Sequence, residues 1–314
     1  MGHNGQVGAW PAHRQHSMPS SSAAVIKVSL QTRRFHGADG LTLTADVGGD
    51  ATAPAVVLLH GGGQTRHSWG TAQQALLARG YHVINLDARG HGDSDWAPDG
   101  RYRLENFAAD LSAVVATLPQ APALVGASMG GITALQAVGG DGLVATALVL
   151  VDVVPRIDPE GGARIAAFMR AHPDGFARLE DAADAVAAYY PERPRPKDPS
   201  GLMKNLRRRE DGRLYWHWDP RFINQPRQVE PPAFAERLLD AARQVRIPSL
   251  LVRGLKSDIV NEAGVRELQS QLPGLEVLDI AGAGHMVAGD RNDAFNDGVL
   301  DFLARHHPPA PAGW

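Results

Sequence analysis

Six short apolar runs, separated by helical patterns, constrain the fold more than any other feature of this sequence. Runs of this length, with no alternation of apolar and polar residues, are typical of strands buried on both faces of a parallel sheet. Their alternation with helical patterns predicts that helices cover both faces. The runs are Ala55–His60, His82–Asp87, Ala123–Ala127, Thr146–Asp152, Ser249–Gly254 and Leu275–Ile280.

The segment before these runs carries a different signal. Val25–Gln31 and Leu41–Asp46 alternate apolar and polar residues around the turn sequence Ala38-Asp39-Gly40. This pattern predicts an antiparallel hairpin. Together with the six runs, it predicts an α/β fold with a mostly parallel eight-stranded sheet flanked by helices.

A long stretch interrupts the alternation of strands and helices. Residues 155–246 contain no clear strand run and are rich in Ala, Arg, Asp and Pro. We expect a helical cap inserted into a core formed by residues 25–154 and 247–306. Residues 1–24 and 307–314 lack periodicity and are expected to be tails. Helical patterns within the cap cover Ala163–Ala171, Ala182–Tyr190, Leu202–Arg209 and Pro232–Arg243.

Composition excludes several classes of function. The 31 Lys and Arg residues nearly balance 34 Asp and Glu residues, and the chain has no Cys. Charge therefore gives no general attraction to nucleic acid or anionic membranes, and thiolate chemistry is excluded. No apolar run is long enough for a membrane span, and no secretory signal pattern is present. We expect a cytoplasmic protein with no nucleic-acid or membrane partner, and the sequence leaves the oligomeric state open.

The sharpest local signal is Gly126-Ala127-Ser128-Met129-Gly130-Gly131, which follows one apolar run and precedes a helical pattern. A G-x-S-x-G sequence between a strand and a helix places its serine on a tight, exposed turn. We therefore expect Ser128 to be a nucleophile. The N–H of Met129, at the start of the following helix, is expected to stabilise an anion beside it.

A second glycine-rich turn, His60-Gly61-Gly62-Gly63, directly follows the first apolar run. Such a turn aims backbone N–H groups at a developing oxyanion. Gly62 is the preferred donor in this turn, and Gly63 is the second choice. The turn lacks the glycine spacing of phosphate-binding loops, which disfavours a nucleotide site.

The expected base is His285, in Gly282-Ala283-Gly284-His285 after the last apolar run. A serine nucleophile needs such a base, and the base needs a carboxylate that orients it. Asp258 follows the preceding strand run and is the favoured carboxylate. Two alternatives stay open, namely Asp152 at the end of its own run and Asp290 just beyond His285.

Other polar and aromatic residues are expected to hold loops or to line a pocket. In the segment Asp87–Ser94 we expect Asp87 and Arg89 to orient loops, and His91 to be structural. We expect Trp216, Trp218, Gly63 and Met286 to line a substrate pocket. His217 and Asp219 have the side chains of metal ligands but no third partner in the sequence. The 13 His residues include no known metal-binding spacing, so we expect no metal site.

The order Ser128, Asp258, His285 resembles the α/β-hydrolase family, in its serine-nucleophile type with a helical cap. The resemblance covers about residues 25–306. It rests on HGGG at 60–63, DARGHGDS at 87–94, GASMGG at 126–131, GLKSD at 254–258 and GAGH at 282–285. The position of Asp258 after its strand matches the family's usual acid.

The resemblance implies hydrolysis of a small-molecule carboxylic ester through an acyl-enzyme, without a cofactor. Two further relatives of this kind use the same three side chains, C–C bond hydrolases and lactonases. Both stay open as alternatives, although Met286 replaces the aromatic residue that several C–C hydrolases carry after their histidine. A slow-turnover ligand-binding protein of the same fold is a third alternative.

Overall fold

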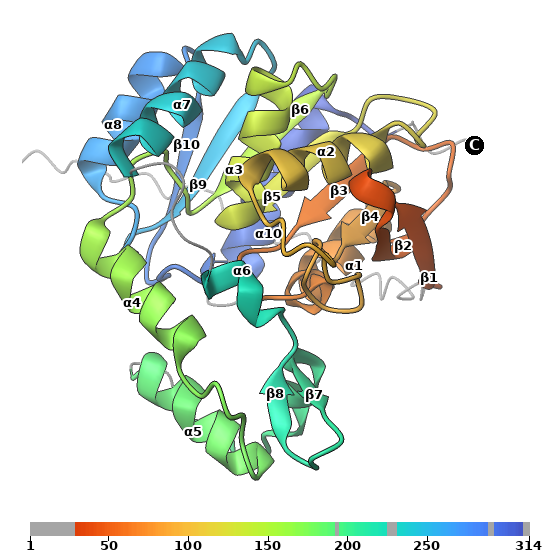
Figure 1. The fold of residues 1–314 in the computed structure, drawn as a ribbon. Coiled ribbons are helices and arrows are strands. Elements are labelled where there is room, and N and C mark those ends of the chain that lie inside the picture. The colour runs from red at the N-terminus through yellow and green to blue at the C-terminus, as the bar shows by residue number, and fades with distance from the viewer. Residues whose placement is uncertain (1–28, 192–194, 225–230, 288–291, 310–314) are drawn as a thin grey trace, which may run out of the picture.

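The computed structural model describes residues 29–191, 195–224, 231–287 and 292–309, and its central element is a sheet (Figure 1). Within these residues the sheet has eight strands in the order β1-β2-β4-β3-β5-β6-β9-β10. Strand β2 pairs antiparallel with β1 and β4, and all the other pairs are parallel. This confirms the expected fold class. The strands are β1 (Gln31–His36), β2 (Thr42–Gly48), β3 (Ala55–Leu59), β4 (His82–Leu86), β5 (Ala123–Ala127), β6 (Ala147–Val151), β9 (Ser249–Gly254) and β10 (Glu276–Ile280).

Each of the six apolar runs forms one strand, with ends within one residue of those expected. The hairpin is displaced, because its first arm is β1 rather than Val25–Gln31. The turn between the arms lies in the expected place, at the short helix η1 (Ala38–Gly40). β1 is mostly exposed at the sheet edge, so burial imposes no apolar pattern that would mark it in the sequence.

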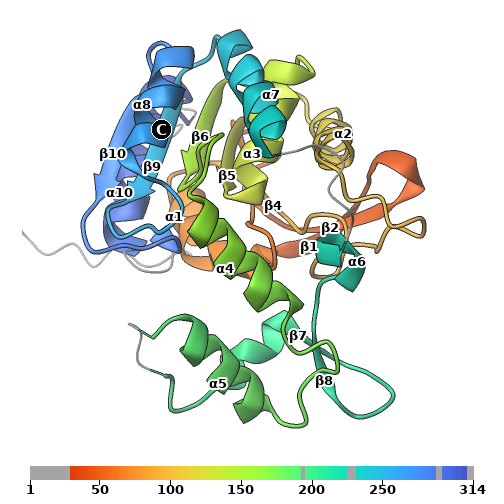
Figure 2. The same cartoon turned by 60° about the vertical axis from the view of Figure 1, so that its left-hand side comes forward.

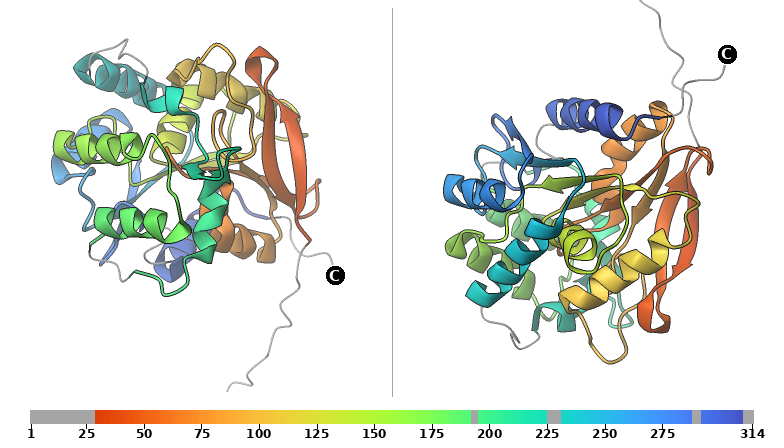
Figure 3. Two further views of the ribbon diagram at one scale, coloured as in Figure 1. Left: turned by 60° about the horizontal axis from the view of Figure 1, so that its bottom comes forward. Right: turned by 90° about the horizontal axis from the view of Figure 1, so that it is seen from above.

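Helices cover both faces of the sheet, as Figure 3 shows from two sides. One face packs against α2 (Leu104–Val115), α3 (Met129–Leu135), α7 (Pro231–Gln244) and α8 (Glu262–Gln271). The other face packs against α1 (Gly70–Ala78) and α10 (Asn292–His306). Neighbouring residues of a strand alternate between these two clusters, as Leu124 and Val125 do.

The cap lies over one end of the sheet (Figures 1 and 2). Its elements are α4 (Pro159–Arg170), α5 (Leu179–Tyr189), η4 (Ser200–Asn205), β7 (Leu206–Arg208), β8 (Leu214–Trp216) and α6 (Pro220–Asn224). The antiparallel pair β7–β8 differs from the expectation of helices alone, and η4 with β7 replaces the helix expected at Leu202–Arg209. Strands of three residues are too short to show a period of two.

Helix α7 was expected in the cap, but it packs against the core. Its residues Leu238, Ala241 and Ala242 belong to the same apolar cluster as Leu135 in α3. Helix α7 packs closely against the segment that follows α3, because a Cβ at Gly139 would lie 2.0 Å from the Ala241 carbonyl oxygen. The apolar stripe of α7 therefore completes one face of the core.

The chain ends differ in how far the structure describes them. The predicted N-terminal tail, residues 1–24, lies outside the described residues, as do residues 25–28 and 310–314. At the other end, the side chain of His307 is buried and hydrogen-bonds Thr146 and the carbonyl of Ala55. None of the helices in the described ranges is long and apolar enough to cross a membrane.

Candidate active site

Ser128 lies on the sharp turn between β5 and α3, with φ 47° and ψ −114°. This backbone conformation is strained for a residue other than glycine. Its flanking glycines are sterically required. A Cβ at Gly126 would lie 2.4 Å from the carbonyl oxygen of Gly130, and one at Gly130 would lie 2.3 Å from that of Leu59. The turn thus places Ser128 in the wall of a cavity at the carboxyl ends of the strands.

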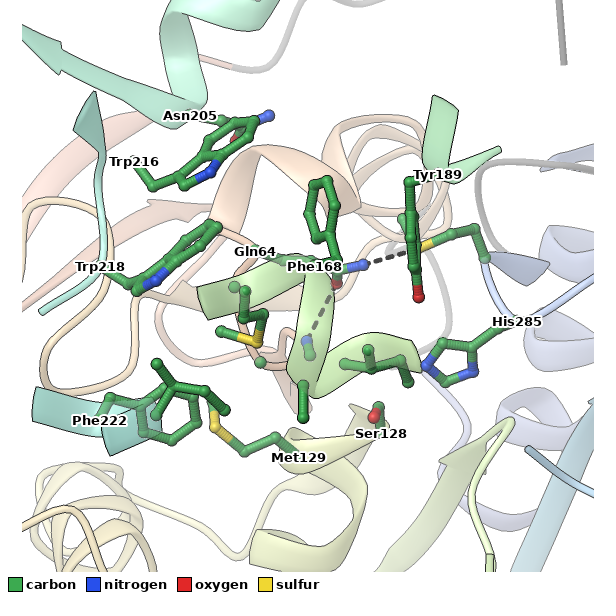
Figure 4. Close-up of a pocket in the computed structure, with 18 of the residues that line it drawn as sticks. Gln64, Ser128, Met129, Phe168, Tyr189, Asn205, Trp216, Trp218, Phe222 and His285 are labelled. Carbon is green, nitrogen blue, oxygen red and sulfur yellow. Dashed lines mark hydrogen bonds between the residues drawn. The ribbon is translucent and has the colours of Figure 1, made fainter. Parts of the chain in front are cut away.

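His285 lines the same end of this cavity, as the close-up in Figure 4 shows. Its Nδ1 hydrogen-bonds Oδ2 of Asp152 over 2.8 Å. The Asp152 side chain is completely buried, whereas that of His285 is 16% exposed. In the tautomer whose Nδ1 donates to this carboxylate, Nε2 is free to accept a proton. This pairing of a buried carboxylate with a histidine is the arrangement that activates a hydroxyl nucleophile.

Two further donors fix the Asp152 carboxylate, one from the last residue of β9 and one from the loop that follows it. The Gly254 N–H donates to Oδ1 over 3.0 Å, and the Ser257 hydroxyl donates to Oδ2 over 2.6 Å. Both Asp152 oxygens are therefore held in place, and Oδ2 accepts from Ser257 and from His285. Three hydrogen bonds compensate for the burial of this carboxylate.

The prediction that Asp258 is the carboxylate partner of His285 is wrong. The Asp258 carboxylate pairs with Arg164 of α4, and these two side chains are 29% and 61% exposed. The loop after β9 bends at Ser257, whose Oγ accepts the N–H groups of Ile259 and Val260. This bend directs Ser257, rather than Asp258, towards the Asp152 carboxylate that binds His285. The third candidate, Asp290, lies outside the described residues.

The glycine-rich turn after β3 leaves one of its amides unused. The Gly61 N–H donates to Oε1 of Gln64 over 3.0 Å, and the Gly63 N–H donates to Nε2 of His91 over 3.1 Å. Within the described residues, the N–H groups of Gly62 and Met129 have no hydrogen-bond partner. Both residues line the cavity beside Ser128. The Gly63 N–H is therefore already used, and Gly62 with Met129 is the pair of amides that the geometry leaves available.

The cavity has a volume of about 960 Å³ and lies between the core and the cap. Gly63, Trp216, Trp218 and Met286 line it, and the two indoles stack with ring centroids 5.2 Å apart. Further aromatic lining comes from Tyr102, Phe107, Phe168, Tyr189, Tyr190, Phe222 and Phe234. Figure 4 shows several of these rings above and beside Ser128. The cavity thus suits an apolar molecule of moderate size.

The charged residues at the cavity are partly neutralised by ion pairs. Arg237 pairs with Glu105, and Arg195 pairs with Asp184 over 2.6 Å. Arg103 and Asp198 also line the cavity, but most of its surface is apolar, so aromatic and aliphatic side chains are the main basis for ligand binding.

The segment Asp87–Ser94 holds loops in place, in line with its expected role. Arg89 is fully buried and makes two hydrogen bonds to the carboxylate of Asp110, of 2.6 and 2.7 Å. The Asp87 carboxylate accepts the N–H of Arg66 and also pairs with its guanidinium. Nowhere in the described residues do three His, Cys, Asp or Glu side chains gather as metal ligands would.

A family model described as the alpha/beta hydrolase family matches residues 56–298. The chain belongs to the alpha/beta hydrolase family. Two further proteins are similar to this chain over most of its length. The chain is 30% identical over 266 residues to esterase Rv0045c of Mycobacterium tuberculosis, covering 80% of this chain and 84% of the relative. It is 29% identical over 276 residues to the sn-1-specific diacylglycerol lipase ABHD11 of Mus musculus, covering 82% and 83%.

Solved structures lead to the same family. An alpha/beta hydrolase from Novosphingobium aromaticivorans superposes with a TM-score of 0.74 at 25% identity, covering 88% of this chain and 98% of the other. Similarity of this extent over both core and cap shows that this protein is an enzyme, a hydrolase of the alpha/beta fold.

Sequence reasoning missed several residues around the site of this hydrolase. Gln64 connects two loops, because its Oε1 accepts from Gly61 and its Nε2 donates to Sδ of Met286 over 2.8 Å. Gly254 and Ser257 hold Asp152, although their loop was expected to supply the acid itself. Each acts through side-chain or backbone hydrogen bonds between segments far apart in sequence. Only the order of strands in the sheet could have pointed to them.

Proposed function

We propose that this hydrolase cleaves carboxylic esters through an acyl-enzyme on Ser128. His285 removes the Ser128 proton as the hydroxyl oxygen attacks the ester carbonyl, and Asp152 stabilises the imidazolium that forms. The N–H groups of Gly62 and Met129 hold the negative oxygen of the tetrahedral intermediate. His285 then protonates the departing alcohol as the carbon–oxygen bond breaks. Finally it activates a water molecule, which releases the acid and frees Ser128.

One observation carries this proposal, namely the hydrogen bond between His285 and the buried Asp152 at the cavity end that holds Ser128. A histidine with a carboxylate on one nitrogen and a serine beside the cavity has the components of a nucleophile–base pair. The two unused amides supply a matching site for a negative oxygen. The names of the two relatives, an esterase and a diacylglycerol lipase, support an ester as the substrate.

The lining of the cavity supports an uncharged, apolar ester. Aromatic rings from the cap and core surround a volume of about 960 Å³, and two of its arginines are already paired. Each methylene that enters such a surface contributes up to about 0.8 kcal/mol of transfer free energy. The proposal therefore expects kcat/KM to rise from an acetate to a butyrate and then an octanoate ester of the same alcohol.

A substrate panel tests the proposal directly. p-Nitrophenyl acetate, butyrate and octanoate would be compared with a lactone and a vinylogous diketone, using wild type and Ser128→Ala. We expect ester hydrolysis by wild type and a loss of about 10⁴-fold or more in Ser128→Ala. Ester hydrolysis that survives this substitution would contradict the acyl-enzyme. Faster cleavage of the diketone or the lactone would instead indicate a C–C hydrolase or a lactonase.

A further inference from the structure

Three buried histidines bind the glycine run Gly61–Gly63 after β3. Each histidine hydrogen-bonds one of three successive peptide groups, 61–62, 62–63 and 63–64. His60 Nδ1 donates to the carbonyl of Gly61 over 2.8 Å, and the Gly63 N–H donates to Nε2 of His91 over 3.1 Å. His217 Nε2 donates to the carbonyl of Gly63 over 3.2 Å. Glycine backbones rotate freely, so bonds of this kind decide where each planar peptide group points.

The same three rings also bind a second loop, residues 88–92. In each ring, the nitrogen that is not bonded to the glycine run meets a backbone group of this loop. The bonds are Ala88 N–H to His60 Nε2 at 3.0 Å, His91 Nδ1 to the Arg89 carbonyl at 3.0 Å, and Gly92 N–H to His217 Nδ1 at 2.8 Å. Backbone groups have fixed donor or acceptor roles, so they fix the tautomer of every ring. The three imidazoles form a bridge between the two loops.

This histidine bridge, His60–His91–His217, is shielded from bulk solvent, and its hydrogen bonds match neutral rings. All three side chains are at most 1% exposed, and the ring centroids are 5.3 Å and 5.8 Å apart along the series. Burial lowers the pKa of each imidazole, and it lowers that of His91 to about 3. A neutral ring offers one donor and one acceptor, which is what each position in the bridge uses.

One member of the bridge comes from the cap. His217 lies between Trp216 and Trp218, the two indoles that line the cavity. This stretch of the cap is anchored to the core, because the Asp219 N–H donates to the carbonyl of Gly90 over 2.9 Å. The Tyr102 hydroxyl also donates to Oδ2 of Asp219 over 2.6 Å.

The cap also closes the space beside Gly63, which has φ 74°. A Cβ at this position would lie 3.1 Å from Cε of Met169 and 3.4 Å from Cζ3 of Trp218. The glycine run therefore contacts cap side chains on one side and the histidine bridge on the other. Cap docking and the shape of this turn are structurally linked.

We propose that His217 is a positioning residue, through which the docked cap fixes the glycine run so that the Gly62 N–H faces the reacting carbonyl. This inference rests on the proposed function of the site. His60 and His91 hold the peptide groups on either side of Gly62, and His217 holds the next one. The cap then has two roles, because it supplies the apolar wall of the cavity and completes the oxyanion site of the core.

Two amide substitutions at His217 separate this role from a general role in packing. Gln places its amide near the position of Nε2, so His217→Gln keeps a donor for the Gly63 carbonyl and loses the bond from Gly92. Asn places its amide near Nδ1, so His217→Asn keeps an acceptor for Gly92 and loses the bond to Gly63. His307→Gln is the matched control, since His307 is a buried, hydrogen-bonded histidine at the end of α10.

We expect His217→Asn to lower kcat for p-nitrophenyl butyrate by about 10- to 100-fold, with KM changed by less than about threefold. His217→Gln is expected to retain kcat within about threefold, and His307→Gln to leave it unchanged. Equal losses in the two His217 variants, or no loss in either, would overturn the proposal. A larger loss in His217→Gln than in His217→Asn would do the same.

Backbone hydrogen exchange of residues 61–64 tests the inference without relying on turnover. Exchange in this segment should rise in His217→Asn relative to wild type, and stay near wild type in His217→Gln. A wild-type protein that hydrolyses no ester would defeat the proposed function, while the exchange comparison would still decide the role of His217. If His217→Asn does not fold, His217→Gln alone still decides the proposal, because this variant keeps the donor for the Gly63 carbonyl. Exchange of residues 61–64 in His217→Gln well above that of wild type would then overturn the proposal, and exchange near wild type would support it.

Discussion

The loops after β6 and β9 share two features in sequence, but they have different roles in the structure. Each follows a buried parallel strand, and each contains an aspartate that could serve His285. Asp152, after β6, is fully buried and accepts hydrogen bonds from His285, Ser257 and Gly254. Asp258, after β9, is partly exposed and pairs with Arg164 of the cap. One loop supplies the carboxylate, and the other supplies the groups that hold it.

The difference teaches that the carboxylate partner of a histidine is recognised by the donors around it more than by its place in a motif. β6 lies between β5, which carries Ser128, and β9. A side chain at the end of β6 is therefore enclosed by both neighbouring loops. The residue at the end of the next loop has open space on its cap side, and there it forms a surface ion pair.

The largest effect is expected for Asp152→Asn. The amide can no longer hold the imidazole in the right tautomer or stabilise its charged form, so kcat should fall by about 10³- to 10⁴-fold. Steady-state kinetics with the best ester of the panel measure this loss, and circular dichroism checks the fold. A variant that retains more than a tenth of wild-type kcat would remove Asp152 from the catalytic group.

The second-largest effect is expected for a substitution at Gly254, the last residue of β9. Gly254→Ala would place a Cβ 2.3 Å from the carbonyl oxygen of Gly284, directly before His285. We expect the histidine loop to be displaced, with a loss of about 10²-fold in kcat and about 1–3 kcal/mol in the free energy of unfolding. Urea unfolding and ester kinetics measure the two losses. If kcat and the free energy of unfolding both stay at wild-type values, the close contact between Gly254 and the Gly284 carbonyl is not required.

A smaller effect is expected for Ser257→Ala. The variant removes one donor from Oδ2 of Asp152 and leaves the bonds from Gly254 and His285 in place. A lost hydrogen bond to a charged group is worth about 1.5–3 kcal/mol, and with two bonds kept we expect the lower end, a decrease of about tenfold in kcat. Ser257→Thr, which keeps the hydroxyl, serves as the control. Equal activity of Ala and Thr variants at the wild-type level would show that this hydroxyl has no role in catalysis.

The smallest effect is expected for Asp258→Asn. Among the residues that the structure describes, its carboxylate pairs with the exposed Arg164 alone, and exposed ion pairs contribute about 0–1 kcal/mol. We expect kcat to change by less than about twofold and the Tm to shift by no more than about 2–4 °C. A thermal melt and the same ester assay measure both. A loss as large as that of Asp152→Asn would restore Asp258 as the acid.

Much of the fold was accessible from the sequence because burial leaves a strong pattern. Five of the six strands, β3, β4, β5, β6 and β9, lie inside the sheet and are almost entirely buried, whereas β10 at the edge is only partly buried. Gly126 and Gly130 mark the Ser128 turn because no larger residue fits there. The exposed β1 and the three-residue strands β7 and β8 leave no such pattern. Helix α7 was located correctly, but its sequence does not say which surface its apolar stripe contacts.

The candidate site was accessible only in part, for a related reason. Ser128, His285 and the glycine turn each carry a local signature, whereas the choice between Asp152 and Asp258 depends on contacts between loops about 100 residues apart. The cap residues Trp216 and Trp218 were recognised as pocket residues by their aromatic character. His217 between them was considered only as a metal ligand, because nothing local shows which backbone group it binds.

Labelling with a fluorophosphonate, followed by mass spectrometry of the adduct, tests the central claim most directly. The account predicts one adduct on Ser128, formed at least about 10²-fold more slowly in Asp152→Asn and at the wild-type rate in Asp258→Asn. An adduct on another residue, or slow labelling in Asp258→Asn with normal labelling in Asp152→Asn, would contradict it.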